Sequence, residues 1–413
     1  LTYMLSREGQ DAIQRDGKWI TLPAERAKEM IAKLDAVGEQ VDPNEVGLHL
    51  KMLAPKKWDG ESPDETGEVD PRAAYYRTRF DLSGLPTYQP DIPLTGTLRM
   101  PASGQLMQSS AGPALVQAFQ ALHPQVRVEL TDGDLVAGQV DVSIGRKWSS
   151  YFAGEVFDFQ QRHERSPVEI QLATGAFDVS GWSPALAVFV GRDNPIQGLT
   201  LRQLDGIFGG PRRGGWVSTT WRRQAGRGAE ENIRTWAQLG VTGRCANQSI
   251  SVYIPPLKYH LMSVFERKVM VGGNIWNDGA HEIPLALNAD GTRSQPSADR
   301  VVAVARDGCG ITFASADVHH PGARIVPIAR EDGDAFVAPS LESVRDRRYP
   351  LHLEVYGYAD QKPGQAMDPK VAQFLRFVLS RQGQEIIQRD GKWLPLTASV
   401  ARTQLARLEQ ISP

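Results

Sequence analysis

The chain has 413 residues, and its 46 Lys and Arg against 48 Asp and Glu leave a net charge of −2. This length exceeds one typical hydrophobic core, so two or three domains or lobes are expected. The balanced charge excludes the global basic field of nucleic-acid-binding proteins, and no apolar run has the length of a membrane span.

The first predicted element is repeated at the end of the chain. Residues 5–19 read LSREGQDAIQRDGKW and residues 379–393 read LSRQGQEIIQRDGKW, with twelve of the fifteen positions identical. An amphipathic segment follows each copy, at 24–34 and at 397–408. The pattern predicts a duplicated helix–turn–helix unit.

The composition changes between the first copy and the next predicted element. Residues 59–71, DGESPDETGEVDP, are acidic, rich in Pro and Gly and without periodicity, which is typical of an exposed linker. From Leu94 the pattern is strand, helix, strand: TGTLRM, GPALVQAFQALHP and VRVEL. This order predicts a parallel sheet with crossover helices.

Further elements follow along the chain. We expect a buried strand at 184–191, a helix at 199–210, strand–turn–strand at 299–315, a strand at 349–360 and a helical stretch at 368–388. Pairs of strands separated by a long insertion are typical of a two-lobed protein whose chain crosses between the lobes more than once.

Cys245 and Cys309 are the only cysteines, and their spacing fits no metal site. A disulfide and two buried thiols are both compatible with the sequence. No Walker loop, G-x-S-x-G or dinucleotide fingerprint is present, so neither an enzyme nor a cofactor is expected. No signal peptide is visible at the first residues.

Two motifs have a specific counterpart in a known family. A hydrophobic strand, a D-N-P turn at 193–195 and L-T-x-x-Q-L-x-x-I-F follow one another, and F-x-L-S-x-x-G-Q…G-x-x-P-L lies near the C-terminus. With the other segments of about 94–396, they resemble the phosphate-type (PstS-like) solute-binding proteins of ABC transporters.

The resemblance implies an α/β protein with the type II periplasmic-binding-protein fold: two α/β lobes joined by hinge strands, with an anion in the cleft. Residues 94–413 would form this domain, with lobe 1 at about 94–185 and 311–413 and lobe 2 at about 186–310. Residues 1–35 would be the C-terminal tail of a first, truncated domain of the same kind, and 36–93 a linker. Such proteins catalyse nothing and deliver their ligand to an ABC permease from the periplasm or another extracytoplasmic space.

The resemblance also implies four binding elements, because a buried oxyanion needs N–H groups, hydroxyls and an arginine. Ser103, Gly104, Gln105 and Leu106 match the first element, with an amide in place of the family's Thr hydroxyl. Gly145-Arg146 matches the third, with Gly in place of Ser. Arg146 would supply a bidentate contact.

The other two elements depart from the family. The second lacks its Gly/Ser run and keeps only Thr131 and Asp132. The fourth, R-x-x-x-S-G-T, is replaced by a segment that begins Pro255-Pro256, in which Lys258 is the candidate for a charged contact. We therefore expect a degenerate site that binds phosphate or another oxyanion weakly. The alternative is a scaffold or interaction domain that has kept the fold and lost ligand binding.

Overall fold

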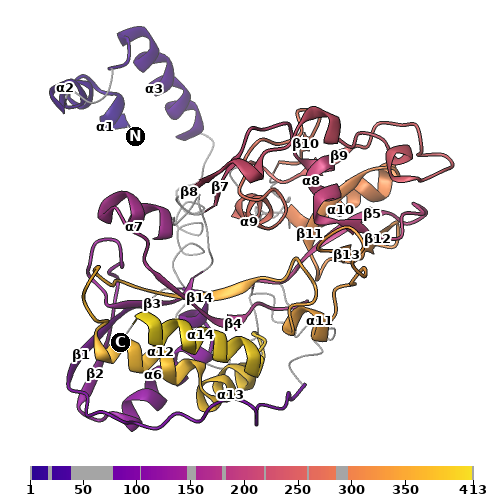
Figure 1. The fold of residues 1–413 in the computed structure, drawn as a ribbon. Coiled ribbons are helices and arrows are strands. Elements are labelled where there is room, and N and C mark those ends of the chain that lie inside the picture. Colours follow the sequence, from indigo (N-terminus) through magenta and orange to yellow (C-terminus); the bar gives the residue numbers. More distant parts are fainter. Residues whose placement is uncertain are drawn as a thin grey trace. The chain divides into compact units, whose positions relative to one another are not determined.

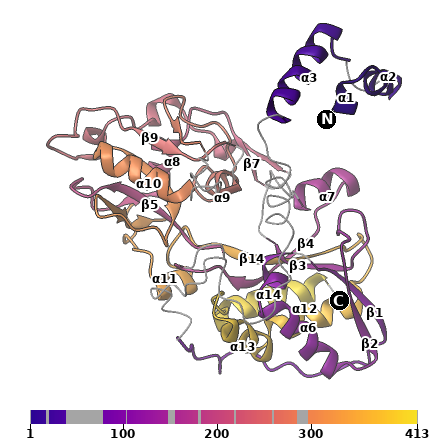
Figure 2. The same ribbon diagram turned by 180° about the vertical axis from the view of Figure 1, so that it is seen from behind.

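The computed structural model describes residues 2–16, 21–38, 78–102, 104–146, 155–178, 183–217, 220–257, 260–284 and 296–411. It divides the chain into two units, residues 1–62 and 63–413 (Figures 1 and 2). We describe each unit by itself. Most of the expected linker, residues 36–93, lies outside the described residues.

The first unit contains, among its described residues, α1 (Thr2–Leu5), α2 (Arg7–Asp16) and α3 (Ala24–Gly38). Ser6 begins α2, because its Oγ accepts a hydrogen bond from the N–H of Gly9 at 3.2 Å. Ala27 of α3 is buried, and α1 packs against both α2 and α3. The helices predicted on either side of the first GKW segment are therefore confirmed.

The second unit begins with a two-stranded and a three-stranded sheet that lie side by side and that we together call the first sheet. Their strands come from both ends of the unit's sequence. The strands are β1 (Gly96–Pro101), β2 (Val126–Thr131), β3 (Val142–Arg146), β4 (Val168–Thr174) and β14 (Glu354–Ala359). β1 and β2 are parallel, as predicted, and β14 lies between β3 and β4, antiparallel to both. β1 lies beside β3, where the N–H of Asp141 donates to the carbonyl of Arg99 at 2.9 Å.

Helices cover this sheet on two sides. They are α5 (Gln105–Gln108), α6 (Ala111–Leu122), α7 (Glu155–His163), α12 (Pro369–Leu379), α13 (Arg381–Asp390) and α14 (Ala398–Ile411). α6, α12, α13 and α14 gather beside the sheet in both ribbon views and form what we call the first core (Figures 1 and 2). Phe159 of α7 packs instead with Tyr356 and Tyr358, because alternate residues of β14 point to opposite faces.

A second sheet has the order β10-β9-β11-β5-β12. Its strands are β5 (Leu186–Gly191), β9 (Val252–Ile254), β10 (His281–Glu282), β11 (Ile311–Ser315) and β12 (Ala323–Val326). β5 is buried along its whole length, as its continuous apolar sequence predicts. Around it pack α8 (Leu201–Phe208), α9 (His260–Lys268) and α10 (Pro296–Asp307), forming the second core.

Short elements complete this part of the chain. They are the two-residue strands β6 (Leu199–Thr200) and β13 (Ile328–Ala329), the hairpin β7 (Gly215–Val217) and β8 (Thr220–Arg222), and α11 (Leu341–Arg345). Single turns of 3-10 helix lie at η2 (Arg223–Ala225), η3 (Ala229–Glu231) and η4 (Trp236–Leu239).

The structure corrects the strand that we predicted at the start of residues 299–315. This stretch is the helix α10, followed by β11. The β-branched run VVAV favours a strand locally, but Val301 and Val304 lie three residues apart and both are fully buried against the second sheet. Tertiary packing therefore overrides the local preference.

The chain crosses between the two cores later than we expected. We placed the return to lobe 1 near residue 311, but β11 and β12 pair with β5 and belong to the second sheet. Leu353 packs in the second core and Val355 in the first. The return therefore falls at the start of β14.

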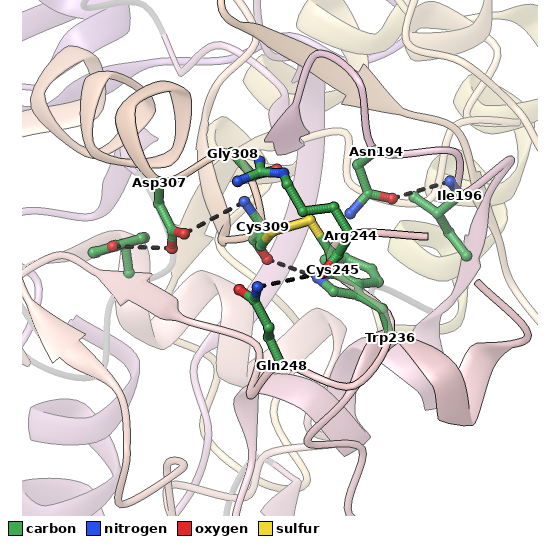
Figure 3. The surroundings of a disulfide bond; sticks show 10 residues. Asn194, Ile196, Trp236, Arg244, Cys245, Gln248, Asp307, Gly308 and Cys309 are labelled. Carbon is green, nitrogen blue, oxygen red and sulfur yellow. Dashed lines mark hydrogen bonds between the residues drawn. A yellow bond between two sulfur atoms is a disulfide. The ribbon is translucent and has the colours of Figure 1, made fainter. Parts of the chain in front are cut away.

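Cys245 and Cys309 form a disulfide with a Cα–Cα distance of 5.4 Å, which decides between the two alternatives left by the sequence (Figure 3). The indole Nε1 of Trp236 donates to the carbonyl of Cys309 at 2.6 Å. The bond joins the loop after η4 to the turn between α10 and β11. Among the described helices, none is both long and apolar enough to cross a membrane.

Candidate functional site

The described residues include only part of the site expected from the sequence. Ser103 and Lys258 lie outside them, and Gln105, Gly145 and Arg146 are described by their backbone alone. Gly104 has φ of +119°, a conformation that favours glycine, and turns the chain from β1 into α5. The expected roles of these residues in ligand binding remain predictions.

The side chain of Leu106 lies in the first core. It is fully buried in the first core, so only its backbone could contact a ligand. Its carbonyl already accepts hydrogen bonds from the N–H of Ser109 at 3.3 Å and from its Oγ at 2.8 Å. The apolar side chain instead anchors α5 in the core.

The strand ends bring the first and third elements together. α5, which follows β1, packs against β3. Arg146 ends β3 opposite Tyr356 of β14 in the strand register. The second element ends beside the first, because the N–H of Ala102 donates to the carbonyl of Thr131 at 2.8 Å.

The second and fourth elements offer few donors. The Oγ1 of Thr131 accepts a hydrogen bond from the N–H of Gly133 at 3.0 Å, and Asp132 is exposed. Pro255 and Pro256 are buried directly after β9 and have no N–H to donate. The described start of the fourth segment therefore has two backbone donors fewer than a segment without prolines would have.

A charged cluster that our sequence reasoning missed lies next to the end of β3. The Nζ of Lys268 is 3.0 Å from Oε1 of Glu354, and Nε2 of His352 is 3.1 Å from the same oxygen. Arg267 donates from Nη2 to the Tyr356 hydroxyl at 3.2 Å. Tyr356 is therefore the link between this cluster and Arg146.

Two further charges belong to the cluster. Nη2 of Arg267 is 3.8 Å from Oε1 of Glu169. Arg347, with φ of +64°, donates from Nη1 to Oε1 of Gln171. Its Nε and Nη2 are buried and have no hydrogen-bond partner among the described residues. These two atoms form one edge of the guanidinium, the geometry that holds a carboxylate or phosphate by two bonds.

Burial and pairing with opposite charges shift the pKa values of the side chains in the cluster. Burial by itself would raise the pKa of Glu354, but the charge of Lys268 and the hydrogen bond from His352 hold that pKa well below its usual range. Burial raises the pKa of Glu169 and lowers the pKa of Arg347. Counted with Arg267, three cationic side chains face two carboxylates.

The sequence does carry a signal for this cluster. Glu354, Tyr356 and Tyr358 alternate along β14, and His352 continues the same spacing two residues before the strand. Polar groups therefore recur on one face of an otherwise buried element. Alternation alone does not reveal that the end of α9 meets this face. Among the described residues, no group of three or more His, Cys, Asp or Glu side chains could hold a metal ion.

Comparison with known proteins decides the family. Residues 134–382, more than half of the chain, match a family described as a PBP superfamily domain. The chain belongs to the PBP superfamily. The type II periplasmic-binding-protein fold expected from the sequence is thereby confirmed.

Relatives of this PBP superfamily member carry phosphate-binding names. This chain is 26% identical over 336 residues to the phosphate-binding protein PstS of Pseudomonas aeruginosa PAO1. The match covers 78% of this chain and 90% of the relative. A solved PstS structure from Borrelia burgdorferi has 12% identity and a TM-score of 0.44, covering 73% and 99% of the two chains. An ABC-type phosphate transport receptor from Vibrio cholerae has 16% identity and a TM-score of 0.41, covering 72% and 99%.

Proposed function

We propose that this PBP superfamily protein is a solute-binding protein of the phosphate-binding type, with a degenerate oxyanion site. The observation that carries the proposal is the cationic cluster around Arg347 beside the end of β3, where the edge Nε–Nη2 has no partner among the described residues. An anion would balance the excess positive charge and accept both bonds.

In this proposal the ligand contacts the loop Ser103–Leu106 through backbone and hydroxyl donors, and Arg146 through its guanidinium. Lys258 would add a further positive charge. Each charge-assisted hydrogen bond contributes about 1.5–3 kcal/mol, so the departures in the second and fourth elements predict weak phosphate binding. The ligand class remains a tetrahedral oxyanion.

The same proposal places the protein outside the cytoplasm, where it would deliver its ligand to an ABC permease. The disulfide Cys245–Cys309 supports an oxidising compartment, because disulfides persist there and are rare in the cytosol. The phosphate-binding name of the Pseudomonas relative supports the transport role.

Thermal unfolding of the full chain with phosphate, sulfate, molybdate or a phosphonate tests the proposal. A ligand at about a hundred times its Kd adds roughly 2.7 kcal/mol of stability. We expect one oxyanion to raise the unfolding temperature and R146Q to remove most of that rise. R127Q, on the exposed side of edge strand β2, is the matched control and should leave the rise unchanged.

A second candidate function is a scaffold or interaction domain without a ligand. Pro255 and Pro256, which remove two N–H donors, favour it. The absence of any shift with every oxyanion would support this candidate and contradict solute binding. Micromolar phosphate affinity in calorimetry would instead contradict a degenerate site.

A further inference from the structure

The first unit reproduces a specific set of side-chain hydrogen bonds. Gln10 donates from Nε2 to the carbonyl of Met4 at 2.6 Å, and its Oε1 accepts from the N–H of Leu22 at 2.7 Å. The amide of Gln10 thus ties the end of α1 to the segment that enters α3. Ser6 caps the helix between them through the N–H of Gly9.

The same bonds recur 374 residues later in the second unit. Gln384 donates from Nε2 to the carbonyl of Val378 at 2.8 Å and accepts from the N–H of Leu396 at 2.7 Å. Ser380 caps α13 through the N–H of Gly383 at 3.3 Å. The two copies therefore share these hydrogen bonds as well as a sequence, and we call each a closing hairpin.

The second closing hairpin shows what its apolar face is built to cover. Gln384 also donates to the carbonyl of Leu172 in β4 at 2.9 Å, and Ile387 is fully buried in the first core. Oδ1 of Asp390 accepts from the N–H of Ser110 at 2.8 Å, at the start of α6. The hairpin thus seals a sheet edge and caps a helix of the lobe.

The first closing hairpin keeps the residue types of that face but does not bury them to the same degree. Ile13, the counterpart of Ile387, is half-buried. Leu22, the counterpart of buried Leu396, is 40% exposed. Apolar residues that are buried in the second hairpin and more exposed in the first indicate that this face of the first hairpin lacks a partner.

We propose that residues 2–38 are a closing hairpin for another lobe of binding-protein type, one that presents a surface like that of α6, α12 and β4 and has no closing hairpin of its own. The proposal rests on the matched hydrogen bonds and buried positions, not on oxyanion binding.

One side chain of the docking face differs between the two hairpins. Oε1 of Gln404 accepts from the N–H of Gln171 in β4 at 3.0 Å. Met30 stands at the equivalent position and has only a weak acceptor. The first hairpin therefore lacks the side-chain acceptor that Gln404 offers to β4.

Substitutions in the full chain test whether the first hairpin fits such a surface, with the lobe of the second unit as the substitute partner. I387D weakens the docking of the second hairpin and leaves its site open to the first. We expect hydrogen exchange of residues 7–16 to slow on the order of tenfold in I387D. I13D alone should leave the unfolding of residues 78–411 unchanged, whereas I13D with I387D should lower its midpoint more than I387D does.

M30Q restores a side-chain amide at the position equivalent to Gln404, and this variant should strengthen the docking of the first hairpin. In the I387D chain it should slow exchange of residues 7–16 further. Additive effects of I13D and I387D, together with unchanged exchange of residues 7–16, would overturn the proposal. If I387D does not fold, I387A replaces it in the same comparison, with the same deciding outcomes.

Discussion

The Nζ of Lys268, the last residue of α9, lies 3.0 Å from Oε1 of Glu354, the first residue of β14. α9 packs in the second core, whereas β14 pairs with strands of the first sheet. The ion pair therefore connects the two cores at the point where the chain passes between them. Both side chains are largely buried, at 15% and 14% exposed.

We expect E354Q to lower the free energy of unfolding by about 3 kcal/mol, because it leaves the buried ammonium of Lys268 without a carboxylate. The low pKa of Glu354 means that this stabilisation is present at neutral pH and decreases as the pH falls below the ordinary range of a carboxyl group. Urea unfolding at several pH values measures both effects.

The double variant E354Q/K268M is the control for this pair. Removing both charges should lower the stability by less than the sum of the two single substitutions. Strict additivity would contradict a coupled ion pair.

Glu266 should make the protein less stable as the pH rises. Burial raises its pKa to about 7, although the hydrogen bond from Nε1 of Trp276, at 2.7 Å, acts in the opposite direction. Since the folded state holds the proton more tightly than the unfolded chain, stability falls as the pH rises from about 4.5 through about 7.

E266Q should remove this dependence while keeping an acceptor for the indole. At pH 8 we expect it to be more stable than the wild type by up to about 3 kcal/mol, and at pH 4 nearly equal to it. E282Q, at an exposed position in β10, should show no such gain. Equal pH profiles for E266Q and the wild type would contradict the assignment.

The disulfide Cys245–Cys309 closes a separation of 64 residues. Constraint of the unfolded chain by such a bond contributes about 2–4 kcal/mol. Reductant should therefore lower the denaturant midpoint of the wild type and leave the midpoint of C245S/C309S unchanged. Equal midpoints for the reduced and oxidised protein would show that the bond does not stabilise the fold.

The family signature was predictable from sequence because its physics is local. Within the D-N-P turn, Oδ1 of Asn194 accepts from the N–H of Ile196 at 3.0 Å. In the L-T-x-x-Q segment, Thr200 and Gln203 form a capping box at the start of α8. Each bond spans two or three residues, so the sequence pattern contains it.

The charged cluster was not predictable in the same way. Lys268 and Glu354 are 86 residues apart in the chain, and only the packing of α9 against the start of β14 brings them together. The strand expected at the start of residues 299–315 was wrong for a related reason, since Arg300 is buried and donates from Nε to the carbonyl of Phe313 at 3.2 Å. Both outcomes depend on distant contacts, which local propensity does not report.

The crossing at the start of β14 has a consequence for cooperativity. Leu353 and Val355 belong to different cores but are separated by a single residue. If either core unfolds, the segment around Leu353 and Val355 loses its packing on that side, and the other core is destabilised as well. Heat should therefore unfold both cores in one calorimetric transition. Two separate transitions would show that the cores unfold independently.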